Sequence, residues 1–154
     1  MKHSAGLLLY RRRDGRVEVL VHPGGPFWAK RDAGAWSIPK GEYEDGEDPR
    51  LAARREFEEE LGSPAPDTAE LDLGEIRQRS GKIVSAWALE GDLDAATIVS
   101  NTCMVQWPPG SGREIEIPEV DRAEWLDLEH AREKINAAQT ALLDRLEQAM
   151  TERG

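Results

Sequence analysis

Residues 41–63 decide the fold of this chain, and they read GEYEDGEDPRLAARREFEEELGS. The second half of this stretch carries the signals of a short helix. Asp48 is a good N-cap, Pro49 suits the first helical turn, and Gly62 suits a left-handed C-cap. The stretch is therefore predicted to be a loop that leads into a helix.

The predicted helix has an apolar face and an acidic face. At about 100° per residue, Ala53, Phe57 and Leu61 share one face, which we expect to pack on a core. Glu56 and Glu59 lie together on another face. Carboxylates three and four residues apart repel one another and destabilise a helix. The acidic face therefore needs compensating positive charge.

Two arginine–glutamate pairs with a spacing of four residues meet part of that need: Arg54 with Glu58, and Arg55 with Glu59. Glu56 and Glu60 are not covered in this way, and Glu60 borders the apolar face, where charge is hardest to solvate. A hard divalent cation with oxygen ligands would compensate such a cluster. A solvated acidic helix explains the same charge pattern, so both interpretations stay open at this point.

The spacing along the whole stretch decides between them. Eight positions resemble the signature box of the Nudix (MutT-type) hydrolases: Gly41, Glu47, Arg55, Glu56, Phe57, Glu59, Glu60 and Gly62. The last box position is usually aliphatic and is Ser63 here, which affects a packing contact but none of the expected ligands. A match of eight specified positions over 23 residues is far more specific than a lone glycine motif.

The resemblance implies both a fold and a chemistry. Nudix proteins are α/β/α sandwiches around a mixed β-sheet, and most hydrolyse a nucleoside diphosphate linked to another group, using Mg²⁺ or Mn²⁺. The implied metal ligands are Glu56, Glu59, Glu60 and the backbone carbonyl of Lys40. The implied catalytic residues are Glu56, Glu59, Arg55 and Glu47. Arg55 and Glu47 would form a pair that orients the glutamates, and Glu56 is our choice for the base that activates water.

The chemistry of a pyrophosphate agrees with this assignment. Its non-bridging oxygens are negatively charged, so a cluster of carboxylates needs metal ions between itself and the substrate. Such ions neutralise charge that develops on phosphoryl oxygens and lower the pKa of a bound water. A nearby carboxylate can then accept the proton of that water.

Length and composition limit the domain organisation. The chain has 154 residues, 39% of them apolar, with five tryptophans, so we expect one domain over residues 1–154 with a proper core. There is no apolar run of about 18 residues and no leader-like start, so we expect neither a membrane span nor a signal peptide. The single cysteine, Cys103, excludes an internal disulfide framework and fits a reducing cytoplasm.

The chain has a net charge of −10, and its charged residues are unevenly distributed along the sequence. Residues 1–40 hold eight Lys and Arg against three acids, residues 41–63 hold three against nine, and residues 64–154 hold nine against eighteen. The acidic total argues against a nucleic-acid polymer as a partner. The basic N-terminal segment still suits the phosphates of a small nucleotide substrate.

Strand-like runs occupy residues 4–10 and 17–22, period-two alternation predicts strands over 71–78 and 82–89, and residues 122–127 resemble the last strand of the family. Asp14-Gly15 predicts a β-hairpin between the first two, and Ser80-Gly81 separates the next two. Asp127 is predicted to cap one long helix. Its apolar stripe would consist of Ala131, Ile135, Ala138, Leu142 and Leu146.

Substrate-binding residues are expected on both sides of the box. In the turn-rich loop over residues 23–34, Trp28 or its neighbour Phe27 would stack on a base, and Lys30 or Arg31 would bind phosphate. An alternative is that the two aromatics close the core beneath this loop. Residues 91–122 are predicted to form a long loop over the site. The family resemblance implies a further glutamate from such a loop, with three candidates: Glu114, Glu116 and Glu119.

Lys40 is the basic residue that we rank first for substrate binding. The lead-in Trp36-Ser37-Ile38-Pro39-Lys40-Gly41 resembles that of the dinucleoside polyphosphate and diphosphoinositol polyphosphate hydrolases, whose lysine lies beside the polyphosphate. No second histidine or cysteine lies at metal-binding spacing from any histidine. We therefore expect structural or exposed roles for His3, His22 and His130.

The leading hypothesis is a Mg²⁺-dependent, or Mn²⁺-dependent, pyrophosphohydrolase of a dinucleoside polyphosphate or a nucleoside triphosphate. A second hypothesis is a Nudix-fold module that senses a nucleotide without cleaving it. A third keeps the enzyme and makes the substrate an inositol pyrophosphate, although that substrate calls for a densely basic pocket.

Overall fold

The computed structural model describes most of the backbone of the chain. The described residues are 3–23, 34, 36–95, 102–106, 110, 112–118 and 123–153, without the side chains of 23, 102–106, 115–118, 152 and 153. Strand β1 (His3–Arg13) and strand β2 (Arg16–Pro23) form the predicted hairpin. Its turn residues Asp14 and Gly15 have φ values of 53° and 77°. Positive φ at both central positions gives the turn type that matches the twist of paired strands.

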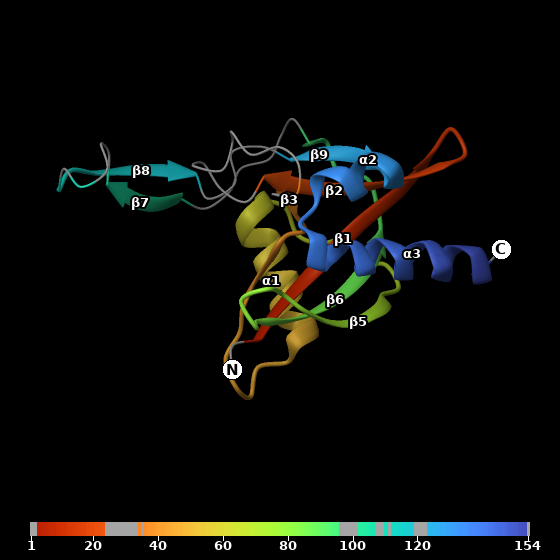
Figure 1. Ribbon diagram of the computed structural model, residues 1–154, viewed down its shortest axis with the longest axis horizontal. Coiled ribbons are helices and arrows are strands. Elements are labelled where there is room, and N and C mark those ends of the chain that lie inside the picture. The colour runs from red at the N-terminus through yellow and green to blue at the C-terminus, as the bar shows by residue number, and fades with distance from the viewer. Residues whose placement is uncertain are drawn as a thin grey trace.

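Seven of the described strands form one mixed sheet in the order β3-β2-β1-β6-β5, with β4 paired to β1 and β9 paired to β2 (Figure 1). The other strands of this sheet are β3 (Trp36–Ser37), β4 (Lys40–Glu42), β5 (Leu71–Arg77), β6 (Ile83–Glu90) and β9 (Glu124–Asp127). The central pair, β1 and β6, is parallel, whereas β5 and β6 are antiparallel. The predicted strands are thus present.

Helix α1 (Pro49–Leu61) has the predicted ends. The side chain of Asp48 accepts a hydrogen bond from the Arg50 backbone N–H at 2.9 Å, and Gly62 adopts φ 76° at the C-cap. The predicted apolar face is buried, because Ala53, Phe57 and Leu61 are each at most 1% exposed. This face packs on β1, β4 and β6.

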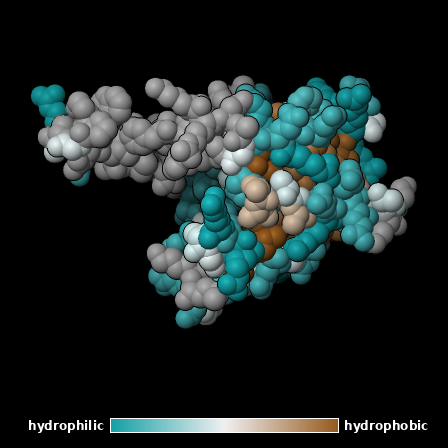
Figure 2. Space-filling view, in the orientation of Figure 1, coloured by the Kyte–Doolittle hydropathy of each residue, from teal (hydrophilic) through white to brown (hydrophobic). Residues whose placement is uncertain are grey.

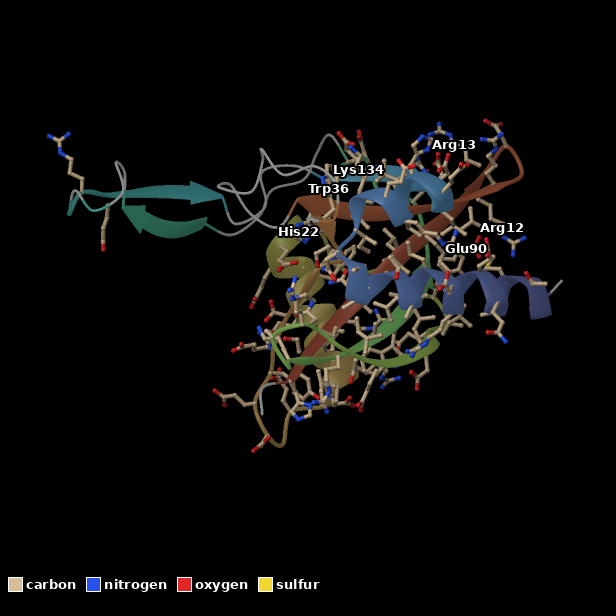
Figure 3. All side chains as sticks on the ribbon, viewed as in Figure 1. Arg12, Arg13, His22, Trp36, Glu90 and Lys134 are labelled. Carbon is tan, nitrogen blue, oxygen red and sulfur yellow. The ribbon has the colours of Figure 1, made fainter. Side chains whose placement is uncertain are left out.

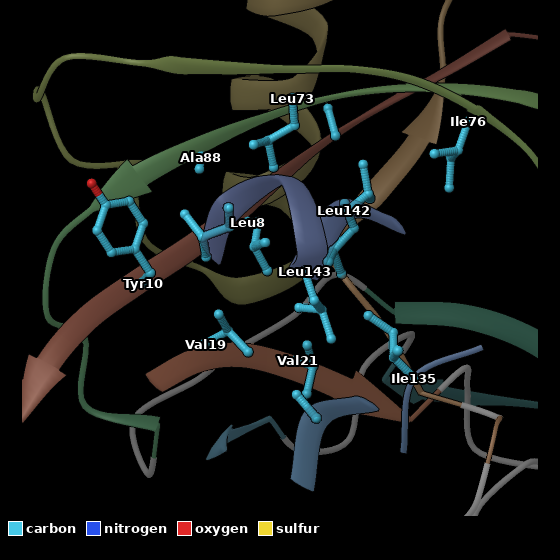
Figure 4. Packing of buried hydrophobic residues seen from close by; sticks show 14 of the residues in the cluster. Leu8, Tyr10, Val19, Val21, Leu73, Ile76, Ala88, Ile135, Leu142 and Leu143 are labelled. Carbon is cyan, nitrogen blue, oxygen red and sulfur yellow. The ribbon is translucent and has the colours of Figure 1, made fainter. Parts of the chain in front are cut away.

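The central strand separates two hydrophobic layers. Ala5, Leu7 and Leu9 of β1 pack against α1, whereas Leu8 and Tyr10 belong to the layer on the other face. Figure 4 shows this second layer, in which Leu142 and Leu143 face Val19 and Val21 of β2. Because helices cover both faces, β1 is apolar at successive positions rather than at alternate ones. The expected α/β/α sandwich around a mixed sheet is confirmed.

The C-terminal layer differs from the single long helix that was predicted. It consists of α2 (Leu128–Lys134), a short 3-10 helix η3 (Ala137–Gln139) and α3 (Thr140–Arg153). Asp127 caps α2 as predicted, but Ile135 is extended, and the side chain of Asn136 accepts a hydrogen bond from the Gln139 N–H. The Asn136 N–H donates to the carbonyl of Trp36 in β3 at 2.8 Å. The prediction of one helix was wrong because this cap and this contact interrupt it.

The prediction of a long loop over residues 91–122 was also wrong in part. Strands β7 (Thr102–Gln106) and β8 (Glu114–Pro118) pair antiparallel as a separate two-stranded sheet. Figure 1 shows this hairpin projecting away from the seven-stranded sheet. On the face in Figure 2, the described surface is mostly hydrophilic, and hydrophobic residues show near its centre. No helix among the described residues combines the length and hydropathy that a membrane span needs.

Candidate active site

Arg55 is the centre of the charged cluster on α1. Its Nε donates to Glu47 Oε2 at 3.1 Å, and its Nη1 donates to Glu56 Oε1 at 3.0 Å. The same Nη1 lies 3.6 Å from Glu59 Oε1. The predicted contacts of Arg55 with Glu47 and Glu59 are therefore present. Glu56 is also paired with Arg55, which the spacing of four residues had not predicted because the two are adjacent in sequence.

Glu56 occupies the space that Gly41 leaves open. A Cβ atom on Gly41 would overlap the carboxylate group of Glu56, so the glycine is required by this close approach. The Glu56 side chain is only 15% exposed. Burial, followed by repulsion from Glu59, raises the pKa of Glu56 above its ordinary value, although Arg55 opposes that shift. The site thus concentrates negative charge at the point where α1 meets β4.

Glu60 is held from two strands on the same side of α1. Its Oε2 accepts a hydrogen bond from the Lys40 backbone N–H at 3.1 Å and lies 3.5 Å from Nε2 of His22. Figure 3 shows His22 next to Trp36, at the end of α1 that carries Glu60. The sequence analysis gave His22 no role at the site. The alternation of side chains along β2 could have indicated such a role, because it places His22 on the same face of the sheet as Leu20. That is the face that α1 covers.

Lys40 lies in the field of both the carboxylates and a second lysine. Burial, then the charge of Lys82, lowers the pKa of Lys40, while Glu60, Glu42 and Glu56 raise it. Lys82 Nζ pairs with Glu42 Oε1 at 3.1 Å. Sequence reasoning missed Lys82, because only the pairing of β1 with both β4 and β6 brings it near Lys40. Two cations therefore border the acidic cluster.

Arg54 does not pair with Glu58 as predicted. Its Nη2 and Nε bond Glu70 Oε1 at 2.7 and 2.9 Å, and its Nη1 donates to the Pro66 carbonyl at 3.1 Å. The segment after the helix folds back along α1 and offers these acceptors, which a helical wheel cannot show. Glu58 is exposed and points away from the core.

Several predicted site residues are not placed by the structure. Trp28 and Lys30 lie outside the described residues, as do Phe27, Arg31 and Glu119. The side chain of Glu116 is not described, and Glu114 is exposed at the start of β8. Their roles stay predictions. His130, by contrast, is exposed and pairs with Asp127 at 2.8 Å, as expected for a histidine outside the site.

The donor set suits a hard divalent cation. Glu56, Glu59 and Glu60 offer carboxylate oxygens on neighbouring turns of one helix, and Mg²⁺ prefers such ligands. Among the described side chains, however, no three potential ligands stand close enough together to hold a metal ion. Arg55 contacts the carboxylates of Glu56 and Glu59, while Lys40 and His22 contact that of Glu60. The charge and the oxygen ligands of this cluster therefore suit Mg²⁺, whereas the spacing of these side chains is not that of a formed metal site.

The fold is shared with solved Nudix structures. This chain superposes on a C. elegans Ap4A hydrolase binary complex with a TM-score of 0.66, at 21% identity over 99% of both chains. It also superposes on the NUDIX domain of Shewanella oneidensis NrtR complexed with ADP ribose, with a TM-score of 0.63, at 15% identity over 96% of this chain and 87% of that one. At such identities the likeness concerns the fold.

Sequence comparisons identify the family. Nudix hydrolase 25 of Arabidopsis thaliana is 62% identical over 29 residues, which are 19% of this chain and only 17% of that relative. A family model described as NUDIX domain matches residues 1–146. The Glu-rich helix, the sandwich that presents it and this match agree with one another. The chain therefore belongs to the NUDIX family.

Proposed function

We propose that this protein is a metal-dependent pyrophosphohydrolase that cleaves a phosphoanhydride bond in a nucleoside polyphosphate. The observation that carries the proposal is the arrangement around α1: Glu56 lies over Gly41, and Glu60 is held at the Lys40 backbone. The similarity to an Ap4A hydrolase supports a dinucleoside polyphosphate as the substrate, and a nucleoside triphosphate is the alternative. The net charge of −10 argues against a nucleic-acid polymer as a partner, so the proposed substrate is a small nucleotide.

The residues that would hold the cation are Glu56, Glu59, Glu60 and the backbone carbonyl of Lys40. Mg²⁺ is the expected ion, with Mn²⁺ as the alternative. When bound, it supplies neutralisation of phosphoryl charge and a water of lowered pKa. The largely buried carboxylate of Glu56, repelled by Glu59 and Glu60, supports this assignment, because an added positive charge offsets both the burial and the repulsion.

The side chains of this protein then have distinct roles. Glu56 would accept the proton of the attacking water, since it is the most closely enclosed carboxylate of Arg55's cluster. Arg55 and Glu47 would keep Glu56 and Glu59 in place through the contacts at 3.0 to 3.6 Å. Lys40 would bind a substrate phosphate, with Trp28 on the base and Lys30 on a second phosphate.

The test is a substrate panel with a matched pair of variants. Nucleoside triphosphates, dinucleoside polyphosphates, ADP-sugars and inositol pyrophosphates are incubated with Mg²⁺ or with a chelator, and released phosphate and nucleotide are measured. Glu60→Gln should abolish turnover. Glu58→Gln on the outer face of the same helix should leave it unchanged, because Glu58 is exposed to solvent.

Each outcome assigns a function. Metal-dependent release that is lost in Glu60→Gln supports the hydrolase and names its substrate. If phosphate is released only from inositol pyrophosphates, the substrate is an inositol pyrophosphate and not a nucleotide. Nucleotide binding by calorimetry without release from any compound would overturn hydrolysis in favour of a sensing module.

A further inference from the structure

His22 is a buried polar side chain in the layer between the sheet and α1, at the edge of the candidate active site. It is 6% exposed, although it is the last residue but one of β2. Val19 and Val21 pack in the layer beneath α3, and Leu20 packs beneath α1. Strand alternation therefore directs the imidazole of His22 towards the last turn of α1. An imidazole in such a place needs a polar neighbour.

That neighbour is Glu60. His22 Nε2 lies 3.5 Å from Glu60 Oε2, and the Glu60 side chain is only 14% exposed. The Lys40 backbone N–H donates to the same oxygen at 3.1 Å. Two groups from two different strands thus hold one oxygen of one carboxylate. In a poorly hydrated location, such contacts are stronger than they are in water.

The backbone of His22 is tied to the same part of the molecule. His22 pairs with Ser37 of β3, three residues before Lys40. The Leu7 N–H donates to the Pro39 carbonyl at 3.1 Å, which fixes the segment between Ser37 and Lys40 to the central strand. β2 therefore supports Glu60 by its side chain and the approach to Lys40 by its backbone.

We propose that His22 is a positioning residue that fixes the orientation of the Glu60 carboxylate for cation binding. This inference rests on the proposed function, in which Glu60 is a metal ligand. The imidazole Nε2 lies 3.5 Å from the oxygen that also accepts from Lys40, and Glu60 is the polar group that it approaches. This contact limits the rotation of a flexible glutamate side chain. Partners of this kind orient a metal ligand without contacting the metal themselves.

A purely structural role makes a different prediction. If His22 only filled space beneath Trp36 and β3, its replacement would lower thermal stability and leave cation binding by the folded protein unchanged. If it positions Glu60, the loss should appear in the cation dissociation constant even where folding is intact. It should also depend on the presence of Glu60.

The experiment compares His22→Leu and His22→Gln with the wild type. Mn²⁺ binding to the substrate-free protein is measured by electron paramagnetic resonance. The thermal unfolding temperature is measured in the absence of metal. His22→Leu should weaken Mn²⁺ binding about 10- to 100-fold, which is the usual effect of removing such a partner. His22→Gln should recover most of the affinity, because its amide can donate to Glu60. His130→Leu is the matched control on an exposed histidine and should not change Mn²⁺ binding.

Glu60→Gln separates a failure of this inference from a failure of the proposed function. If Glu60→Gln binds Mn²⁺ as tightly as the wild type, the metal assignment and the proposed function fail. If Glu60→Gln weakens binding and His22→Leu does not, only the role of His22 is overturned. The double variant should bind no more weakly than Glu60→Gln alone, since the two residues would act through one contact. Independent, additive losses would contradict the inference.

Discussion

Helix α1 and the segment formed by α2, η3 and α3 cover opposite faces of one sheet, but they differ in what they contribute. The C-terminal segment contributes a layer of apolar side chains, with Leu142, Leu143 and Leu146 fully buried. Helix α1 buries Phe57 and Leu61 as well, but it also carries carboxylates that Arg55, Lys40 and His22 hold in place.

The layer on one face of the sheet thus contributes mainly to stability, and the layer on the other face also carries the residues of the candidate active site. Burial of apolar side chains favours folding, whereas enclosing carboxylates beside one another opposes it. Substitutions in the C-terminal layer should therefore change stability, and substitutions at the acidic edge of α1 should change activity. Four predictions test that division.

The largest effect is expected for Glu56→Gln. Loss of the proposed base should lower kcat about 10²- to 10⁴-fold, measured by nucleotide release under saturating Mg²⁺. Burial, then repulsion from Glu59, raises the pKa of Glu56 in the folded state, so its charged form opposes folding above the unfolded pKa. In metal-free buffer the variant should thus melt at a higher temperature than the wild type at pH 7. That difference should fade as the pH falls through the raised pKa. A variant that keeps full activity would contradict the assignment of the base.

Leu143→Ala should have the opposite profile. Leu143 is fully buried beneath β2, so its truncation should lower the free energy of unfolding by about 2–5 kcal/mol. Urea unfolding gives this quantity, and kcat per folded molecule should stay near that of the wild type. A large fall in kcat at a temperature where the variant is folded would show that the two layers are coupled.

Gly41→Ala tests the contact between β4 and α1. The added methyl group would overlap the Glu56 carboxylate, and overpacking of this kind costs about 1–3 kcal/mol. Displacement of Glu56 should also reduce kcat, by about 5- to 30-fold if about 1–2 kcal/mol of transition-state stabilisation is lost. Gly15→Ala in the hairpin turn is a control for the kcat effect: Gly15 has open space around it but a φ of 77°, so the variant should cost stability through backbone strain without touching the site. It should leave kcat unchanged, and equal losses in both variants would argue against a specific role of Gly41.

The smallest effect is expected at His130, on the C-terminal side. Its hydrogen bond and ion pair with Asp127 raise the pKa of His130, so this contact stabilises the folded state below the unfolded pKa. The contribution should be lost as the pH rises through the raised pKa. His130→Ala should therefore melt slightly below the wild type near pH 5 and at the same temperature near pH 9. A difference that persists at pH 9 would point to a contact other than the ion pair.

Much of the fold follows from local sequence signals. The turn at Asp14-Gly15, the N-cap at Asp48 and the C-cap at Gly62 were predicted and are present. Each depends on backbone preferences and hydrogen bonds that span a few residues. The helical spacing also placed Phe57 and Leu61 in the core, because burial follows the period of the helix.

Predictions about contacts were less successful where the partner comes from elsewhere in the chain. Arg54 pairs with Glu70 rather than with the glutamate one turn away, since the segment after α1 returns along the helix. The long C-terminal helix is interrupted at Ile135, where the chain approaches β3. Helical periodicity could not predict this break, because the apolar residues keep their three- and four-residue spacing on both sides of it.

The sequence by itself determined the helix that carries the glutamates, and its resemblance to the Nudix box implied the family and the pairing of Arg55 with Glu47, because the box residues stand at fixed spacings within residues 41–63. Only the tertiary structure decided that His22 contacts Glu60 and that Gly41 makes room for Glu56. It also decided that Gln139 accepts a hydrogen bond from the Ile38 N–H, 101 residues earlier in the chain. The physical reason is that buried polar groups take the partners that the packing of strands and helices brings to them, whatever their distance in sequence.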